Sequence, residues 1–254
     1  MDSNLIQWPT AKYWTAQWNP IIGCKPCSPA CENCYAAAWA KRFGQSFEPH
    51  ESSQLRPPRK GVVFCGNMTD LFGEWLGISR SMSYFGDLFH WSEDRAKSGT
   101  PIPNGATYLF LTKRVGRMMV ALNNYVSILN AYFGFTAENQ EWYEKRLSEW
   151  TKPWTNALEH RNGWLSCEPL LGPINLHFYT YWNIPRWVVV GCESGPNSRP
   201  CKIEWVESIV EQCMAANVPV FVKQLDINGR CVTDINRFPA HLRIRQVPWA
   251  KERK

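Results

Sequence analysis

The sequence predicts an α/β protein built as a partial or complete (β/α) TIM-like barrel. Three observations support this prediction. Short, fully apolar runs alternate with helical stretches, which is typical of parallel strands covered on both faces. Polar residues follow nearly every one of those runs. The length of 254 residues suits a barrel that folds as one domain.

The predicted elements follow one another in a regular order. The first strand is expected to end at residues 21–22 and to lead into a loop, because Gly23, Pro26 and Pro29 disfavour a helix. A helix follows over 35–43 and stops at Gly44. The later strands are predicted at 62–65, 108–111, 132–135, 164–165, 187–190 and 218–222, and the later helices up to about 123 and over 142–150 and 203–216.

About seven strands leave a barrel and an open, doubly wound sheet as alternatives. The barrel is favoured because its strands converge with their carboxyl ends on one mouth, where active sites lie. In an open sheet the same polar residues would spread along an edge and meet mainly at a switch point. We therefore expect the polar residues after the strands to surround one cavity.

The composition is that of an ordinary globular chain, with 44% hydrophobic and 20% charged residues and an unusual 14 Trp. The net charge of +6 permits a polyanionic partner such as a nucleotide or nucleic acid, although a basic surface equally serves solubility. We expect a single domain over 1–254, with 225–254 as a basic C-terminal extension.

The start of the chain lacks the basic and apolar regions of a signal peptide. No apolar run approaches the roughly 20 residues that a membrane-spanning helix needs. A cytoplasmic protein without membrane contact is therefore expected. Disulfides are rare in that compartment, so clustered cysteines point to metal binding or catalysis.

Four of the ten cysteines, Cys24, Cys27, Cys31 and Cys34, fall within eleven residues. Cys27-x3-Cys31-x2-Cys34 has the spacing of a three-thiolate iron–sulfur site, and Cys24-x6-Cys31-x2-Cys34 is a looser version of it. Three thiolates hold three irons of a [4Fe–4S] cluster and leave the fourth iron open for S-adenosyl-L-methionine. A zinc site made by all four cysteines is the alternative, although structural zinc usually joins two separated Cys or His clusters.

The residues after the predicted strands would match S-adenosyl-L-methionine, which presents an ammonium, a carboxylate, a ribose and an adenine. Candidate acceptors for the ammonium or ribose are Asp70, Glu138, Glu168 and Glu193. Candidate partners for the carboxylate or a substrate phosphate are Lys113, Arg114 and Lys223. Candidates for neutral hydrogen bonds are Asn67, Thr69, Thr112, Thr136, Ser166, Ser194 and Gln224.

Lys113, Glu168 and Lys223 are also the candidates for a catalytic role. Lys113 ranks above Arg114, because Arg114 equally suits the start of a solvated helix face. Tyr35 follows the last cysteine and is expected to pack beside the cluster or the adenine. Each of these residues would as readily serve as a structural cap or ion pair, but uncompensated buried charge is costly, so together they indicate a common polar cavity.

Seven groups of residues, in order over about 14–224, carry a resemblance to a known family. They are 18–20 with 23–24, 28–36, 68–72, 111–114, 166–173, 191–195 and 221–224. On these segments the chain resembles the phage-encoded three-Cys-motif family, a radical-SAM-like domain of unknown function. The resemblance implies a barrel of the radical SAM type, a [4Fe–4S] cluster and S-adenosyl-L-methionine as cofactors.

The resemblance also bears on the third ligand. The family's Cys-x6-Cys-x2-Cys pattern falls on Cys24, Cys31 and Cys34 and favours Cys24, whereas the general radical SAM spacing selects Cys27. Cys31 and Cys34 are common to both patterns. Where the family has Gly-Gly-Glu, this chain has Gly-Cys-Glu over residues 191–193, which retains the carboxylate.

The sequence thus predicts a radical S-adenosylmethionine enzyme, an isomerase or lyase. A phage setting, a basic surface and many aromatic residues suggest a nucleobase or nucleotide in phage DNA modification, for example isomerisation of a modified thymine. A radical lyase that repairs a DNA lesion is one alternative, and both need a flipped or free base. The expected partner is an electron donor such as flavodoxin or ferredoxin, in the host cell cytoplasm. The other alternative is a non-enzymatic zinc- or cluster-stabilised binding protein.

Overall fold

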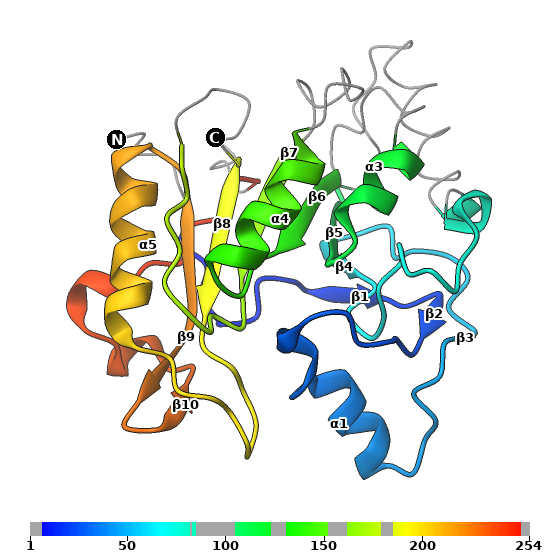
Figure 1. Ribbon diagram of the computed structural model, residues 1–254, viewed down its shortest axis with the longest axis horizontal. Helices are drawn as coiled ribbons and strands as arrows, with labels where there is room; N and C mark the ends of the chain where they lie inside the picture. The colour runs from blue at the N-terminus through cyan, green and yellow to red at the C-terminus, as the bar shows by residue number, and fades with distance from the viewer. Residues whose placement is uncertain are drawn as a thin grey trace.

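Eight strands form the main sheet of the computed structural model, which describes residues 7–81, 83–84, 105–122, 131–151, 162–178 and 185–249 (Figure 1). In spatial order they are β1 (Ala16–Trp18), β4 (Val62–Cys65), β5 (Thr107–Thr112), β6 (Ala131–Thr136), β7 (Asn162–Cys167), β8 (Trp187–Gly191), β9 (Val220–Ile227) and β10 (Arg230–Val232). Neighbours are parallel up to β9, and β10 is antiparallel to β9. The predicted α/β fold with a mostly parallel sheet is confirmed.

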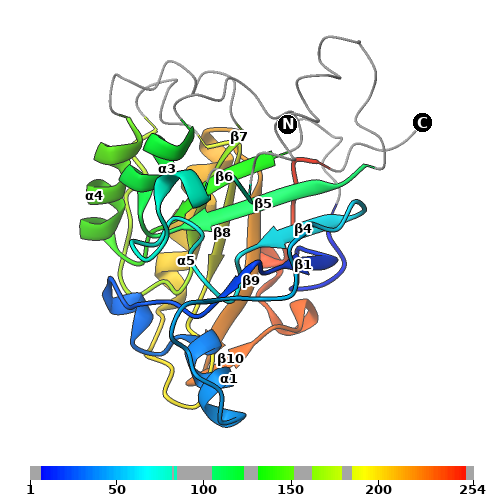
Figure 2. The ribbon, with the colours of Figure 1, turned by 90° about the vertical axis from the view of Figure 1, so that its right-hand side faces the viewer.

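Three helices follow strands of this sheet, as predicted. They are α3 (Val115–Leu122), α4 (Gln140–Trp150) and α5 (Ile203–Ala215). The helix α1 (Tyr35–Arg42) lies apart from them in both ribbon views (Figures 1 and 2). Short 3-10 turns are η1 (Pro29–Cys31), η4 (Ile235–Arg237) and η5 (Ala240–Leu242). Within the described residues, no helix has the length and apolar character needed to cross a membrane.

The strand order follows the chain without the reversal that creates the switch point of a doubly wound sheet. This winding is the one expected of a barrel. The sheet nevertheless has two edges, β1 and β10, and these do not pair in the part of the chain that the structure describes.

The prediction for the first strand is wrong. Residues 21–22 form β2 (Ile21–Ile22), which pairs with β3 (His50–Glu51) outside the main sheet. The main sheet begins at β1, whose three residues include only one buried side chain, Trp18. At the other end, β9 runs across residue 225, where the C-terminal extension was expected to begin. Residues 244–246 then return to hydrogen-bond with Val220 and Val222 of β9.

The two faces of the sheet carry separate cores, because side chains alternate along each strand. The outer face packs against α3, α4 and α5 through residues such as Val63, Phe110, Phe133, Leu165 and Val190. The inner face carries a cluster rich in aromatic rings: Tyr13, Phe64, Tyr132, Trp164, Trp187 and Phe221. We call this cluster the aromatic floor. Farther along the same face, the alternation places Thr136, Ser166 and Lys223 at the carboxyl ends of their strands.

A glycine makes the aromatic floor possible. A Cβ at Gly134 of β6 would lie 2.5 Å from the Trp164 carbonyl oxygen and 2.6 Å from the indole nitrogen of the same residue. The Trp164 indole instead packs over the glycine and donates a 2.9 Å hydrogen bond to the Phe110 carbonyl. On its other side Trp164 is the register partner of Trp187 on β8, and the two rings lie 5.1 Å apart.

Candidate functional site

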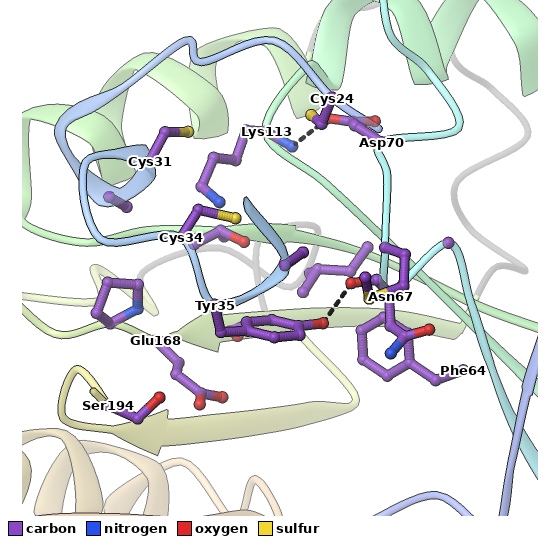
Figure 3. Close-up of a pocket in the computed structure, with 18 of the residues that line it drawn as sticks. Cys24, Cys31, Cys34, Tyr35, Phe64, Asn67, Asp70, Lys113, Glu168 and Ser194 are labelled. Carbon is purple, nitrogen blue, oxygen red and sulfur yellow. Dashed lines mark hydrogen bonds between the residues drawn. The ribbon is translucent and has the colours of Figure 1, made fainter. Parts of the chain in front are cut away.

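The carboxyl ends of the parallel strands border one cavity of about 520 Å³ (Figure 3). The cysteine loop between β2 and α1 also lines it. The predicted site residues that line this cavity are Cys24, Cys31, Cys34, Tyr35, Asn67, Thr69, Asp70, Thr112, Lys113, Arg114, Thr136, Ser166, Glu168, Glu193, Ser194, Lys223 and Gln224. Cys27 and Glu138 are not among the lining residues. The rule that polar strand ends converge therefore holds for this chain.

The cysteine loop begins at a glycine that no other residue replaces easily. Gly23 has φ +94°, and a Cβ there would lie 2.5 Å from the carbonyl oxygen of Glu48. The close approach lets Cys24 N–H donate to the Phe47 carbonyl at 3.1 Å and Gly23 N–H donate to the Met68 carbonyl at 3.1 Å. The loop is thereby turned so that Cys24 lines the cavity, while Cys27 does not.

The four thiols of the loop are free, half-buried and unequal in acidity. A hydrogen bond from Cys27 lowers the pKa of Cys31 to about 4 against the opposing effect of burial. Burial raises the pKa of Cys24 to about 12. The Lys113 ammonium, whose charge acts on both of these thiols, points toward Cys34 in Figure 3.

The donor chemistry of this loop fits a three-thiolate iron–sulfur site. Cys24, Cys31 and Cys34 are soft ligands that open onto the same cavity. Within the described residues, no three His, Cys, Asp or Glu side chains lie close enough together to hold a metal ion. The three sulfurs must therefore converge for a cluster to bind.

One end of the cysteine loop is held by a buried arginine, in an arrangement that we call the Arg114 anchor. Arg114 Nη2 donates to the Lys25 carbonyl at 2.9 Å, and its other nitrogens reach Asp70 at 3.2 Å and Glu74 at 2.6 Å. Thr112 Oγ1 also donates to Asp70, at 2.7 Å. Arg114 is 8% exposed, so it does not begin a solvated helix face. The reason for ranking it below Lys113 is wrong.

The other end of the loop is held by a second arginine, the Arg199 anchor. Arg199 Nη2 and Nε lie 2.5 and 3.0 Å from the two carboxylate oxygens of Glu193, and Nη1 lies 3.0 Å from Glu32. Asn33 Nδ2 donates to Glu193 at 2.8 Å. Burial raises the pKa of Glu193, but the hydrogen bonds from Arg199 and Asn33 outweigh it and hold that pKa below its usual value. Glu193 thus already holds the segment that carries Cys31 and Cys34.

Lys223 and Glu168, which also line the cavity, form an ion pair. The Lys223 ammonium also lies 5.7 Å from the ring centroid of Trp14. Glu168 contributes, after burial, to raising the pKa of the Tyr13 hydroxyl of the aromatic floor. Two of the three candidate catalytic residues, Glu168 and Lys223, are therefore present at the cavity as partners of each other.

Three polar groups at the cavity keep capacity for a ligand. Within the described residues, Lys12 and Lys113 form no ion pair, and the buried Ser166 hydroxyl has no hydrogen-bond partner. A buried polar atom without a partner at a cavity is a place where a bound molecule completes a hydrogen bond. The two ammonium groups would attract a carboxylate or phosphate.

Glu138 is placed elsewhere. It is fully buried, and its carboxylate lies 2.5 Å from Arg146 Nη1 of α4. The same Arg146 nitrogen donates to the Thr136 carbonyl at 2.8 Å. The structure thus joins Glu138 to the helix layer behind the cavity wall.

Tyr35 lies at the edge of the cavity, directly after Cys34. Its hydroxyl donates to the Asn67 carbonyl (Figure 3). Asn67 Oδ1 in turn accepts a 2.8 Å hydrogen bond from Asn19. These contacts join the start of α1 to the loop after β4.

The sequence analysis missed one side of the cavity. Lys12, Tyr13, Trp14 and Gln17 line it, together with Phe64 of β4. The first four precede or belong to β1, and the misplaced first strand hid them. The only sequence signal of this side is the presence of Tyr13, Trp14 and Trp18 in a stretch without a continuous apolar run.

The family model described as "Protein of unknown function (DUF5131)" matches residues 9–230, and the chain belongs to this family. The match includes all residues that line the cavity. No curated protein matches the chain.

One similar solved structure is described as "Spore photoproduct lyase complexed with dinucleoside spore photoproduct". The two chains are 12% identical with a TM-score of 0.42, and the likeness covers 68% of this chain. It covers 54% of the lyase chain, so this protein spans about half of its length.

Proposed function

We propose that this single-domain protein is a radical S-adenosylmethionine enzyme that acts on a nucleobase or nucleotide. The observation that carries the proposal is the shared cavity: Cys24, Cys31 and Cys34 open onto the same space as the polar carboxyl ends of the strands. A volume of about 520 Å³ is in the usual range of small-molecule sites.

In this proposal Cys24, Cys31 and Cys34 hold a [4Fe–4S] cluster. Such a cluster, when bound and reduced by a flavodoxin or ferredoxin, would supply the electron for reductive cleavage of S-adenosyl-L-methionine. Lys113 and Lys12 bind carboxylate or phosphate groups, and Ser166 donates to or accepts from the bound cofactor. Glu168 and Lys223 are the candidates for proton transfer at the substrate. Their charges neutralise each other in the ion pair, and a ligand that separates the pair would meet both groups.

The proposed substrate is a base in DNA or a nucleotide, and the reaction is isomerisation of a modified thymine. Support comes from the net charge of +6 and from the two cavity lysines without an ion pair. Lesion cleavage by a lyase is the second reaction that fits a base in this cavity. Either reaction needs the base to leave the stack.

Anaerobic reconstitution with iron and sulfide tests the enzyme class. We expect about four irons per chain, a spectrum that changes on adding S-adenosyl-L-methionine, and release of 5′-deoxyadenosine under reductant. One tightly bound zinc without 5′-deoxyadenosine would instead identify a zinc-stabilised binding protein, for which the four free thiols of the loop also provide ligands.

The matched variants Cys24→Ala and Cys27→Ala test the ligand set. Cys24→Ala is expected to lose the cluster, and Cys27→Ala is expected to retain it, because only Cys24 of the two lines the cavity. The reverse result would assign Cys27 as the third ligand. For the substrate, mass spectrometry of DNA nucleosides from phage-infected cells with and without the protein would reveal the altered base.

A further inference from the structure

Three aromatic side chains stand exposed in a row along α1 and at the residue that follows it. Tyr35, Trp39 and Phe43 are 54%, 46% and 56% exposed, and their spacing of four residues places them on one side of the helix. The Trp39 and Phe43 ring centroids are 4.8 Å apart. The other large hydrophobic side chains with such exposure in the described residues are not aromatic: Leu55, Val120 and Met214.

The row starts at the cavity and leads away from it. Tyr35 lines the cavity, whereas Trp39 and Phe43 do not. Figures 1 and 2 show α1 projecting from one end of the molecule, apart from α3, α4 and α5. Only Ala36 and Ala40 of this helix are buried. Trp39 and Phe43 stand exposed, whereas the Tyr35 ring reaches the cavity and donates to the Asn67 carbonyl.

The charged residues of α1 itself, Lys41 and Arg42, are both cations. Residues 35–47 contain no Asp or Glu, and Lys41 and Arg42 are exposed among them. The Arg42 guanidinium lies 5.8 Å from the Phe43 ring centroid. At the cavity end of the row, Lys113 adds a cation without an ion pair in the described part of the chain. A ligand of this surface must offer flat rings and negative charge together.

We propose that α1 is a binding track for single-stranded nucleic acid, with bases stacked on Trp39 and Phe43 and a phosphate beside Arg42. Base stacking on aromatic side chains, combined with a basic path for the backbone, is how proteins hold single strands without reading their sequence. The track leads toward Tyr35 and the cavity. That a base from the bound strand enters the cavity rests on the proposed function.

Fluorescence anisotropy with a labelled 12-nucleotide single strand tests the track, using the purified full chain without reductant or S-adenosyl-L-methionine. Trp39→Ala is expected to weaken binding by about 5- to 150-fold, and Trp39→Phe to restore most of it. Arg42→Gln is expected to reduce the slope of log K against log salt by about 0.7, and Lys41→Gln, on the opposite side of the helix, is expected to change it less. Met214→Ala, Lys202→Gln and a duplex of the same length are the controls. DNA and RNA strands in parallel identify the preferred backbone.

Unchanged single-strand affinity in Trp39→Ala would overturn the track. The track would also be overturned if the duplex bound as tightly as the single strand and lost the same affinity in Trp39→Ala, because stacking on α1 requires unpaired bases. The track would likewise be overturned if Trp39→Ala changed the oligomeric state or the affinity for flavodoxin and left oligonucleotide binding intact. If instead the track binds strands but no 5′-deoxyadenosine forms in the reconstituted protein, the proposed function fails and the track stands.

Discussion

The two ends of the cysteine loop are both held by arginine–carboxylate pairs, but they differ in burial. The side chains of Arg114 and Asp70 are 7% and 8% exposed. The contrast lies in the arginines: Arg199 is 29% exposed, although its first partner, Glu193, is only 3% exposed. The second partners, Glu74 of Arg114 and Glu32 of Arg199, are both exposed, at 62% and 69%. Charges taken out of water depend strongly on their partner, whereas exposed pairs contribute little. We therefore expect the Arg114 anchor, whose cation is buried, to contribute more to the stability of the fold. The Arg199 anchor, whose cation is reached by water, is expected to act mainly on the cysteine loop.

The largest expected effect is that of Arg114→Met. This variant leaves the buried Asp70 carboxylate without its cation, so the free energy of unfolding should fall by about 3–5 kcal/mol. Urea denaturation followed by Trp fluorescence measures it. The control is Arg80→Met at the exposed Arg80–Glu51 pair, for which a loss of less than about 1 kcal/mol is expected. Equal losses in the two variants would remove the distinction between the anchors.

Arg199→Met should cost less, about 1–2 kcal/mol, because water reaches part of this anchor. Its main effect is expected in the loop, since Arg199 reaches both Glu193 and Glu32. Amide hydrogen exchange should accelerate in a peptide over 28–35 and stay unchanged in one over 187–191. An unchanged rate in the first peptide would show that Asn33 alone holds the loop.

Acid should weaken the Arg199 anchor. The pKa of Glu193 is depressed in the folded protein, so its carboxylate stabilises the fold above the unfolded pKa and loses this contribution as the pH falls through the folded value. Glu193→Gln is expected to lower the free energy of unfolding equally at pH 6 and 7. The difference from the unmodified protein should shrink below about pH 4.5. Urea titrations at each pH test this, and a difference that grows in acid would contradict it.

Salt should give the smallest effect. At 1 M ionic strength the screening length is about 3 Å, which weakens exposed pairs far more than buried ones. The cost of Arg199→Met is therefore expected to decrease between 0.05 and 1 M NaCl (roughly the range over which screening changes most), while that of Arg114→Met stays constant. Equal salt dependence in denaturation curves would indicate that water reaches both anchors alike.

The strands that sequence alone predicts well are those buried on both faces. The four residues of β4 and the five of β8 are all buried, so each appears as an uninterrupted apolar run. β1 gives no such signal, because two of its three residues, Ala16 and Gln17, are not buried. β1 is a strand because it pairs with β4, so its prediction would require knowing that residues 62–65, far along the chain, lie beside it.

The site is predictable to the level of which residues meet, because parallel strands bring their carboxyl ends together. Their partners are not predictable, since they come from distant positions. Glu193 is paired by Arg199 on the following loop and by Asn33, 160 residues away. Glu138 is drawn from the cavity by Arg146. Which of Cys24 and Cys27 lines the cavity depends on the turn at Gly23, which spacing does not encode.

The pairing of β1 with β4 has a consequence for the cysteine loop. All four loop cysteines lie in the excursion over residues 19–61 between these strands, outside the strand register. Connections between strands tolerate changes of length and sequence better than the strands do. The excursion can therefore vary between its two anchors without shifting the register of the strands on either side of it.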